Sequence, residues 1–452
     1  MLFYFYSWTV SGQEVLNDSV LLNRVYDEAL KDQTSYDNLR YLTNVIGGRV
    51  CGSPQAAAAV EWSEQLLRES GADTVYRQEL MVKNWKRGDK EYASVTSTKF
   101  GFREVNIAAL GGSSPTPPGG IVARVVEVQS FDELAKLGKE AVAGKIVFFN
   151  RPMDPVHYYT FEAYGGAAGQ RVSGASEAAR YGAAGAIVRS LTLSEDEFPH
   201  TGSMHYSADD KLSLPVAAIC TRDANILSNW LHNDKNLNFY YKLNCKTLPD
   251  VQSFNVIAEI QGTDFPGDVI TIGGHLDSWD IDPGAHDDGA GCVQAIEVLR
   301  IIKKLEIKPK HTIRIVMFMD EEMAQRGALK YSENALAKKE HHIAAIESDR
   351  GGLTPVGFSI DAPDFQVEKI KSWKMYFDNY GLHDIGKGGS GVDIGPLKKQ
   401  NVPLIALVTE SQRYFEFHHC ANDTFENLNR RELQLGSAAI TFLVLLIDRY
   451  GL

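Results

Sequence analysis

Cysteine is scarce in this 452-residue sequence, and no two cysteines have the spacing of a metal or redox motif. No CxxC pair occurs, which excludes a thiolate zinc knuckle and a thioredoxin-like motif. We expect the thiols to be free and mostly buried. A single bridge between Cys220 and Cys245 is the alternative. The five cysteines are Cys51, Cys220, Cys245, Cys292 and Cys420.

Basic clusters and long apolar runs are also missing. The formal net charge is −12, and no Lys/Arg-rich run or basic aromatic face occurs, so nucleic acid is not an expected partner. No run reaches the roughly 18 apolar residues of a membrane span. The longest, AAITFLVLLI near the C-terminus, predicts a buried final helix. Residues 1–17 are apolar at the start but lack Lys and Arg. They are either a local hydrophobic arm or the remnant of a signal peptide.

The second half of the chain alternates between strand-like and helix-like segments. VITIGG, HTIRIVMFMD, HIAAIESD and PLIALVTE are continuous apolar runs, typical of strands covered on both faces. Amphipathic stretches such as AIEVLRIIKKL and GALKYSENALAKK lie between them. This alternation predicts an α/β fold with a layered sheet flanked by helices.

The first half contains a change of pattern at a Pro/Gly/Ser-rich linker. Before it, the sequence predicts helices over 18–30 and 36–45, a third helix from Ser53-Pro54 to Gly71, and a strand pair at VYRQELMV and EYASVTST. The linker SSPTPPGG sustains neither helix nor sheet. After it, short β-rich runs alternate with helical segments. We therefore predict a separate insert domain of mixed β and α structure over residues 115–247.

Acidic and histidine residues gather where the strands of the second half end. The segment GGHLDSWDIDPGAHDDGAG, which follows the apolar run VITI, contains two His and five Asp. In open α/β sheets, ligands bind at the carboxyl ends of the strands. Four predicted strand ends carry such residues toward one crevice: His275 with Asp287-Asp288, Glu321-Glu322, Asp349, and His418-His419.

So many carboxylates in one partly buried crevice require cations, because each loses water and repels the others. Nitrogen and oxygen ligands without thiolate suit zinc, with cobalt or manganese as alternatives. The number of ligands favours two metals roughly 3.5–4 Å apart that share one carboxylate. Each residue alone has a structural alternative, such as a helix cap for Asp287-Asp288. Five such coincidences at consecutive strand ends are improbable.

The same motifs resemble a known family. HLDSWD, AHDDGAG, DEEM, ESD and FHHCAND are similar to the motifs of the di-zinc aminopeptidase-like exopeptidases, in particular their carboxypeptidase Q-like members. NWKRGD, SFDEL, GKIVFFN and FNVIAEI extend the likeness over roughly residues 20–450. The resemblance implies an aminopeptidase-like mixed sheet flanked by helices, a zinc peptidase domain over 18–114 and 248–452, and a β-rich protease-associated domain inserted at 115–247.

The resemblance also implies roles for individual residues. His275, Asp287 and Asp349 would hold one Zn²⁺, and Asp287, Glu322 and His419 the other. Glu321 would be the general base. Asp277 would fix the tautomer of His275.

Some positions depart from the family pattern or remain alternatives. His418 is a weaker candidate than His419, which lies four residues before the Asp of Asp423-Thr424. His286 can ligate a metal but is expected to point elsewhere. MAQRG replaces the family's usual QGxxG after the glutamate pair. Asp393, in GGSGVDIGPL, is expected near the bound peptide.

The function implied is hydrolysis of dipeptides or short peptides with free termini, with two Zn²⁺ per chain. An aminopeptidase of the same fold is the alternative, and a non-catalytic, receptor-like relative a more remote one. The family likeness also suggests a homodimer and a secreted or periplasmic location.

Overall fold

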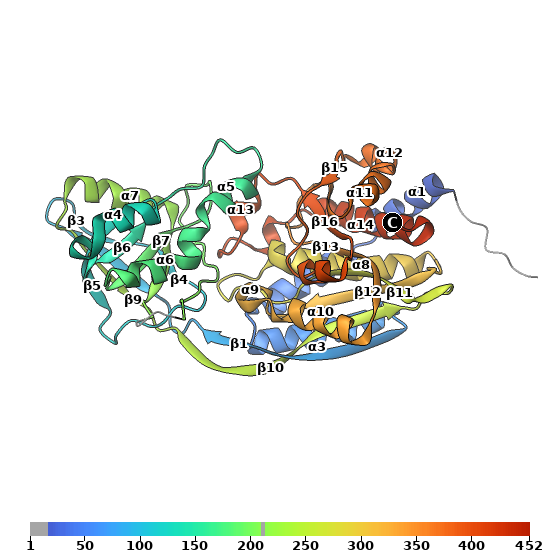
Figure 1. Cartoon of the computed structure of the whole chain (residues 1–452), viewed down its shortest axis with the longest axis horizontal. Helices are drawn as coiled ribbons and strands as arrows, with labels where there is room; N and C mark the ends of the chain where they lie inside the picture. The colour runs from blue at the N-terminus through green and yellow to red at the C-terminus, as the bar shows by residue number, and fades with distance from the viewer. Residues whose placement is uncertain (1–16, 209–212) are drawn as a thin grey trace, which may run out of the picture.

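A computed structural model describes residues 17–208 and 213–452, which form two eight-stranded sheets joined by a long two-stranded ribbon (Figure 1). The prediction of an N-terminal arm or signal remnant falls almost entirely on residues outside the described ranges. The first sheet lies to the right in Figure 1. Its strands come from two parts of the chain, one before and one after the residues that form the second sheet.

The first sheet has the strand order β1-β10-β12-β11-β13-β16-β14-β15. Its central neighbours β12, β11, β13 and β16 are all parallel, so their carboxyl ends share one edge. The outer strands β1 and β10 pair antiparallel, as do β14 and β16. The strands are β1 Thr74–Lys86, β10 Lys246–Ile260, β12 His311–Phe318, β11 Phe265–His275, β13 His341–Glu347, β16 Leu404–Thr409, β14 Pro355–Asp361 and β15 Asp384–Lys387.

Both faces of this sheet are buried, as the continuous apolar runs predict. In β12, Ile313, Ile315 and Met317 belong to one hydrophobic cluster, and Val316 and Phe318 belong to another on the opposite face. The α/β class is therefore confirmed. The helices of this half are α1 Asp18–Lys31, α2 Thr34–Tyr41, α3 Pro54–Glu69, α8 Ala290–Lys304, α9 Glu321–Ala324, α10 Arg326–Lys338, α11 Asp364–Lys371, α12 Lys374–Phe377, α13 Tyr414–Phe417 and α14 Arg430–Tyr450.

The final helix α14 packs against α1 and α8, and its apolar residues are buried. Among the described helices it is the one whose length and composition would suit a membrane span, but 83% of its most apolar window is buried inside the protein. The expectation of a buried core helix agrees with this packing.

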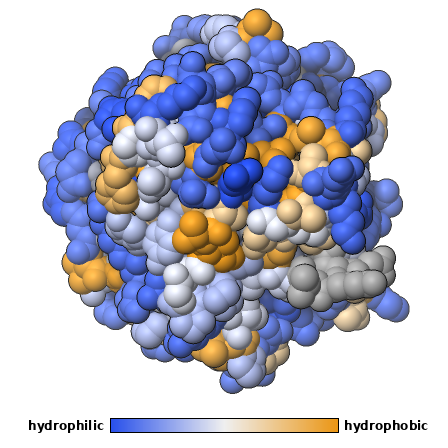
Figure 2. Space-filling view, turned by 90° about the vertical axis from the view of Figure 1, so that its left-hand side faces the viewer, coloured by the Kyte–Doolittle hydropathy of each residue, from blue (hydrophilic) through white to orange (hydrophobic). Residues whose placement is uncertain are grey.

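The second sheet has the strand order β3-β2-β9-β5-β6-β7-β8-β4. Its strands are β2 Tyr92–Ser97, β3 Gly101–Glu104, β4 Ile107–Ala109, β5 Ile121–Val128, β6 Ile146–Phe149, β7 Gly185–Arg189, β8 Val216–Ile219 and β9 Asn238–Lys242. Its helices are α4 Phe131–Val142, α5 Thr160–Ala167, α6 Gly169–Arg180 and α7 Thr221–Asn233. Three of its strands, β2, β3 and β4, thus precede residue 115 in the sequence. Figure 2 shows the outer end of this half, where hydrophilic residues surround separate small apolar patches.

The predicted strand pair at VYRQELMV and EYASVTST is wrong. Both segments are strands, but β1 pairs with β10 in the first sheet, whereas β2 pairs with β3 and β9 in the second. The chain crosses between the sheets at Arg87, whose buried guanidinium bridges Asp280 at 2.8 Å and Glu91 at 2.9 Å. Alternation along a strand indicates its buried face but does not identify its partner.

All five cysteines are free and buried. The expectation of unpaired buried thiols is confirmed, and the alternative bridge between Cys220 and Cys245 is not formed. Cys245 donates to the carbonyl of Ser113, and Cys220 donates to the carboxylate of Asp223.

The packing of α14 predicts a large loss of stability when its core is truncated. Leu446 is fully buried, so Leu446→Ala is expected to lower the free energy of unfolding by about 2–5 kcal/mol. Leu336, 65% exposed on α10, is the matched control, and Leu336→Ala should change it by less than about 0.5 kcal/mol. Chemical denaturation measures both values, and equal small effects would contradict this packing.

Candidate active site

The parallel strands of the first sheet bring the predicted acidic and histidine residues to one edge. His275 is the last residue of β11, and Asp349 comes two residues after β13. Glu321 and Glu322 begin α9 just after β12, and His418 and His419 follow α13 beyond β16. This is the edge at which open α/β sheets bind ligands.

Asp287 is the centre of the cluster. Its Oδ1 lies 3.2 Å from Nε2 of His275, and its Oδ2 lies 3.2 Å from Nε2 of His419. On the first side, Asp349 Oδ1 is 3.6 Å from His275 Nε2. On the second, Glu322 Oε2 is 3.0 Å from His419 Nε2. One carboxylate therefore faces two separate sets of ligand-type atoms, each with one histidine and one further carboxylate.

The carboxylates of Asp423 and Asp288 accept hydrogen bonds from the backbone around Asp287 and so fix its position. Asp423 accepts hydrogen bonds from the backbone N–H groups of His286, at 2.7 Å, and Asp287, at 3.0 Å. Asp288 accepts from the backbone N–H groups of His275 and Gly291, both at 3.0 Å, so it ties the end of β11 to the start of α8. The peptide bond between Asp287 and Asp288 is cis. Asp288 therefore has the capping role considered for the pair, and Asp287 does not.

Asp277 contacts His275 as expected, but through its backbone carbonyl oxygen and not through its carboxylate. Nδ1 of His275 lies 2.9 Å from the backbone carbonyl oxygen of Asp277, whereas the Asp277 carboxylate is 4.0 Å away. That carboxylate instead accepts a hydrogen bond from the backbone N–H of Glu321 at 3.2 Å. A carbonyl oxygen only accepts, so Nδ1 donates to it and Nε2 is turned toward Asp287 and Asp349.

The histidine pair is held by the half of the chain that contains the second sheet. His200 donates from Nδ1 to the carbonyl of His418 at 2.7 Å, and the backbone N–H of Thr201 donates to the carbonyl of His419 at 2.9 Å. His419 has a φ of 62°, an uncommon conformation for a residue with a side chain. The two rings stack at 3.5 Å between centroids. Contacts from the part of the chain that forms the second sheet thus fix the position of His419.

A cavity of about 370 Å³ opens beside this cluster. Its wall includes Glu321, which directly precedes Glu322 in the sequence. Both halves contribute to the remaining wall: the first sheet's half provides Asp287, Glu322, Gln325, Glu347, Asp349, Arg350, Ser390, Gly391, Val392, Ala406, Tyr414, Phe415, His418 and His419, and the other provides Phe161, Tyr164, Arg171 and Ser203.

The electrostatics of the cluster resist simultaneous ionisation of its carboxylates. Burial raises the pKa of Glu321 well above its usual range, and the pKa values of Glu322 and Asp349 are raised for the same reason. Burial and the charge of Asp349 raise the pKa of Glu347 to about 8. Only Asp287 shows the opposite shift: burial is outweighed by hydrogen bonds from His275 and His419, which hold its pKa well below the ordinary value.

These residues fit divalent cations. Glu322 Oε1 and Asp349 Oδ1 are buried and lack a hydrogen-bond donor among the described residues. Ligand atoms of His275, Asp287 and Asp349 lie within 4.8 Å of one another, as do those of Asp287, His418 and His419. Cations would replace the protons that the cluster otherwise retains. Nitrogen and oxygen donors without sulfur are a donor set suited to zinc.

His286 and Asp393, the two other residues considered in the sequence, are not part of the cavity wall. His286 contacts the carbonyl of Asn427 at 3.4 Å through Nε2, and its ring stacks on Phe417 at 4.7 Å, away from the cavity wall. Asp393 is only 1% exposed and does not line the cavity. Ser390, Gly391 and Val392 of the same loop line the cavity, and the N–H of Ile394 donates to Glu347 at 2.8 Å. The place of Asp393 beside a bound peptide stays a prediction.

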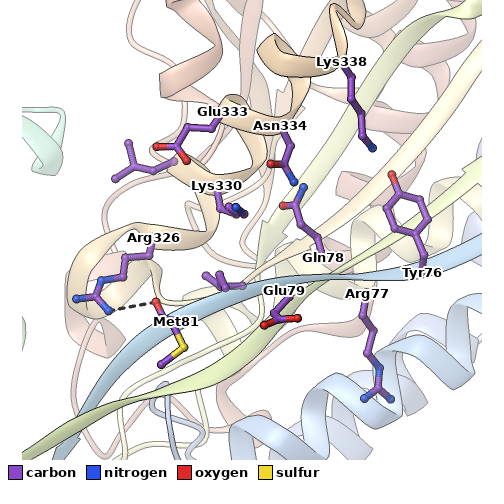
Figure 3. A pocket seen from close by; sticks show the side chains of 12 residues that line it. Tyr76, Arg77, Gln78, Glu79, Met81, Arg326, Lys330, Glu333, Asn334 and Lys338 are labelled. Atoms are coloured by element: carbon purple, nitrogen blue, oxygen red, sulfur yellow. Dashed lines mark hydrogen bonds between the residues drawn. The ribbon is translucent and has the colours of Figure 1, made fainter.

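A larger hollow lies elsewhere, between β1 and α10 (Figure 3). It has a volume of about 780 Å³ and is lined by mixed charges that include Arg77, Glu79, Lys330 and Glu333. The dashed line in Figure 3 joins Arg326 to the carbonyl of Met81 at 3.1 Å. None of its lining residues is His or Asp. Of these two cavities, only the smaller one is therefore lined by histidine and aspartate.

The fold and the site define a metallo-exopeptidase built on a mixed α/β sheet. The model of Peptidase family M28 matches residues 255–444, which include every predicted metal ligand. Carboxypeptidase Q of Bos taurus is 32% identical over 93% of this chain and 86% of its own length. Carboxypeptidase Q of Homo sapiens is 32% identical over 92% of this chain and 84% of its own length. The chain belongs to peptidase family M28 and is similar to carboxypeptidase Q.

Solved structures agree with this assignment. The Peptidase M28 precursor from Shewanella amazonensis superposes with a TM-score of 0.87 and 30% identity, covering 95% of this chain and 96% of that one. BSAP, a zinc aminopeptidase from Bacillus subtilis, has a TM-score of 0.65 and 20% identity over 91% of this chain and 93% of its own, and shows the shared fold. The zinc-peptidase fold class predicted from the sequence is confirmed.

The contact from His200 to the His418 carbonyl predicts a role in metal binding without direct ligation. His200→Ala removes this hydrogen bond and should weaken zinc affinity about 10- to 100-fold, because residues that orient ligands typically have effects of that size. Competition with a zinc chelator measures the affinity. His232→Ala, an exposed histidine on α7, is the control and should bind zinc like the unchanged protein. Equal zinc affinity in both variants would contradict the positioning role.

Proposed function

We propose that the protein hydrolyses the peptide bond of dipeptides or short peptides with free termini, using two Zn²⁺ ions per chain. The observation that carries this proposal is the position of Asp287 between His275 and His419, at 3.2 Å from each Nε2. A carboxylate that faces two histidines in opposite directions suits a bridge between two ions. The similarity to carboxypeptidase Q along the chain supports the reaction class.

In this proposal His275, Asp287 and Asp349 hold one ion, and Asp287, Glu322 and His419 hold the other. His419 is favoured over His418 because its Nε2 lies 3.2 Å from Asp287 Oδ2, compared with 3.8 Å for His418, and because it also contacts Glu322. Zinc bound here would lower the pKa of a water molecule towards about 7 and polarise the scissile carbonyl.

Glu321 is the proposed general base. Glu321 lines the cavity, next in sequence to the proposed ligand Glu322. It is therefore available to take a proton from the attacking water and to return one to the leaving amine nitrogen. Asp277 supports both sides of the site: its carbonyl orients His275, and its carboxylate accepts from the Glu321 backbone N–H.

Several wider features of the protein stay with this proposal. The mixed α/β region around residues 115–247 would act as a protease-associated insert that covers the cavity, which Phe161, Tyr164, Arg171 and Ser203 border. The carboxypeptidase Q likeness is also the reason to propose a homodimer and a secreted or periplasmic location. An aminopeptidase is the second candidate function, since a similar fold carries a zinc aminopeptidase in BSAP.

The general-base assignment predicts a separation of metal binding from turnover. Glu321→Gln keeps the side-chain volume but removes the base, so kcat for an unblocked dipeptide should fall by about a hundredfold or more. Zinc content should remain that of the unchanged protein, because Glu321 is not a proposed ligand. Steady-state kinetics and elemental analysis on the same sample provide the two measurements.

Glu333→Gln is the matched control, since Glu333 is exposed on α10 and lies outside the catalytic cavity. It should retain the turnover and the zinc of the unchanged protein. Near-full turnover in Glu321→Gln would show that another group is the base. Hydrolysis that persists after complete zinc removal by a chelator would contradict the metallopeptidase mechanism itself.

A further inference from the structure

Arg171, on α6, is a buried cation without a counter-ion in the described residues. Its side chain is part of the cavity wall, and the residue is only 7% exposed. Nη2 donates to the hydroxyl of Tyr164 at 2.7 Å. Nε and Nη1 have no acceptor among the described residues, neither a carboxylate nor any other group. A buried charge without a partner is costly, so its retention beside a cavity indicates an anionic ligand.

The surroundings of Arg171 place it close to the catalytic cluster. Its guanidinium lies over the ring of Tyr164, 5.4 Å from the centroid, and that ring meets His418 edge to face at 5.2 Å. His418 in turn stacks on His419. Arg171 therefore borders the same cavity as the scissile bond would, but it comes from the half that contains the second sheet.

Gly202 provides the space for this guanidinium. A Cβ atom at that position would lie 2.5 Å from Nη1 of Arg171, and the φ of 134° also disfavours a larger residue. Gly202 directly follows Thr201, which donates to the carbonyl of His419. The same short segment thus supports the histidine pair and accommodates Arg171.

Arg350 is the other guanidinium on the cavity wall, and carboxylates lie near it. It lies over the Phe161 ring at 5.3 Å and is next in sequence to Asp349. The charges of Asp349, Glu347 and Asp384 all act on it. Arg171 differs from it in having Nε and Nη1 buried without an acceptor among the described residues, which makes it the cation available to a ligand.

We propose that Arg171 binds the free α-carboxylate at the C-terminus of the peptide substrate. This inference rests on the proposed function and adds the polarity of the substrate to it. An arginine fork donates two parallel hydrogen bonds to a carboxylate, a charge-assisted arrangement that an amide end does not reproduce. A carboxylate anchored beside the zinc ligands restricts the chain beyond the scissile bond to a short leaving segment. The site is thereby a carboxypeptidase or dipeptidase site, and an aminopeptidase has no need of this contact.

The test compares the binding of alanyl-alanine and alanyl-alanine amide to the zinc-loaded protein by calorimetry. All proteins carry Glu321→Gln, so that the ligand persists and the readout does not depend on turnover. The Glu321→Gln protein that retains Arg171 should bind the free acid more tightly than the amide by about ten- to a hundredfold. Adding Arg171→Gln should remove that preference and leave the affinity for the amide unchanged.

Arg171→Lys keeps the charge but not the fork, and should retain a smaller preference for the acid. Arg180→Gln, on the same helix, is the control: Arg180 is exposed, pairs with Glu177 at 2.8 Å, and should keep the full preference. Equal loss of acid and amide binding in Arg171→Gln would overturn the proposal, as would equal binding of both ligands by the Arg171 protein. Absence of hydrolysis by the unsubstituted holoenzyme would contradict the proposed function, while the binding preference would still test Arg171.

Discussion

Mutual repulsion between buried carboxylates is the constraint on which the site depends. Asp287, Glu321, Glu322, Glu347 and Asp349 all border one cavity, and burial raises the pKa of four of them. An apolar surrounding disfavours several negative charges at such short range unless cations balance them. The two histidines on either side of Asp287 place ring nitrogens at the points where such cations would lie.

The fold explains why these groups meet despite their separation in sequence. Four neighbouring parallel strands end at the same edge, and the loops or short helices at these ends contain the ligand-type residues. A sheet buried on both faces holds these strand ends rigidly, because its core packs on each side. The part of the chain that forms the second sheet then completes the arrangement by hydrogen bonds from His200 and Thr201 to the histidine loop.

Much of this arrangement follows from local sequence patterns. Continuous apolar runs predicted the central strands, and the polar residues after each run predicted the edge at which they gather. Strand pairing was harder, since β1 and β2 have similar patterns but belong to different sheets. The exchange of the Asp277 carboxylate for its carbonyl also lies beyond sequence reasoning, because both atoms belong to one residue.

The roles of residues from the second-sheet part of the chain were not predicted, for a related reason. His200 contacts a residue 218 positions further along the chain, and neither it nor Arg171 lies in a pattern typical of a ligand. The segment PHTG, residues 199–202, also resembles the di-zinc exopeptidase family, and this likeness was the signal that the sequence offered for His200. Long-range contacts of single side chains require the folded structure, whereas clusters at strand ends can be read from the spacing of motifs.

The most direct test of the central claim is anomalous X-ray diffraction at the zinc absorption edge from crystals of the purified protein. The account predicts two zinc peaks, roughly 3.5–4 Å apart, on opposite sides of the Asp287 carboxylate. One peak should contact His275 and Asp349, and the other Glu322 and His419. A zinc-saturated crystal with no peak beside Asp287, or with a single ion that leaves one histidine unligated, would contradict the account.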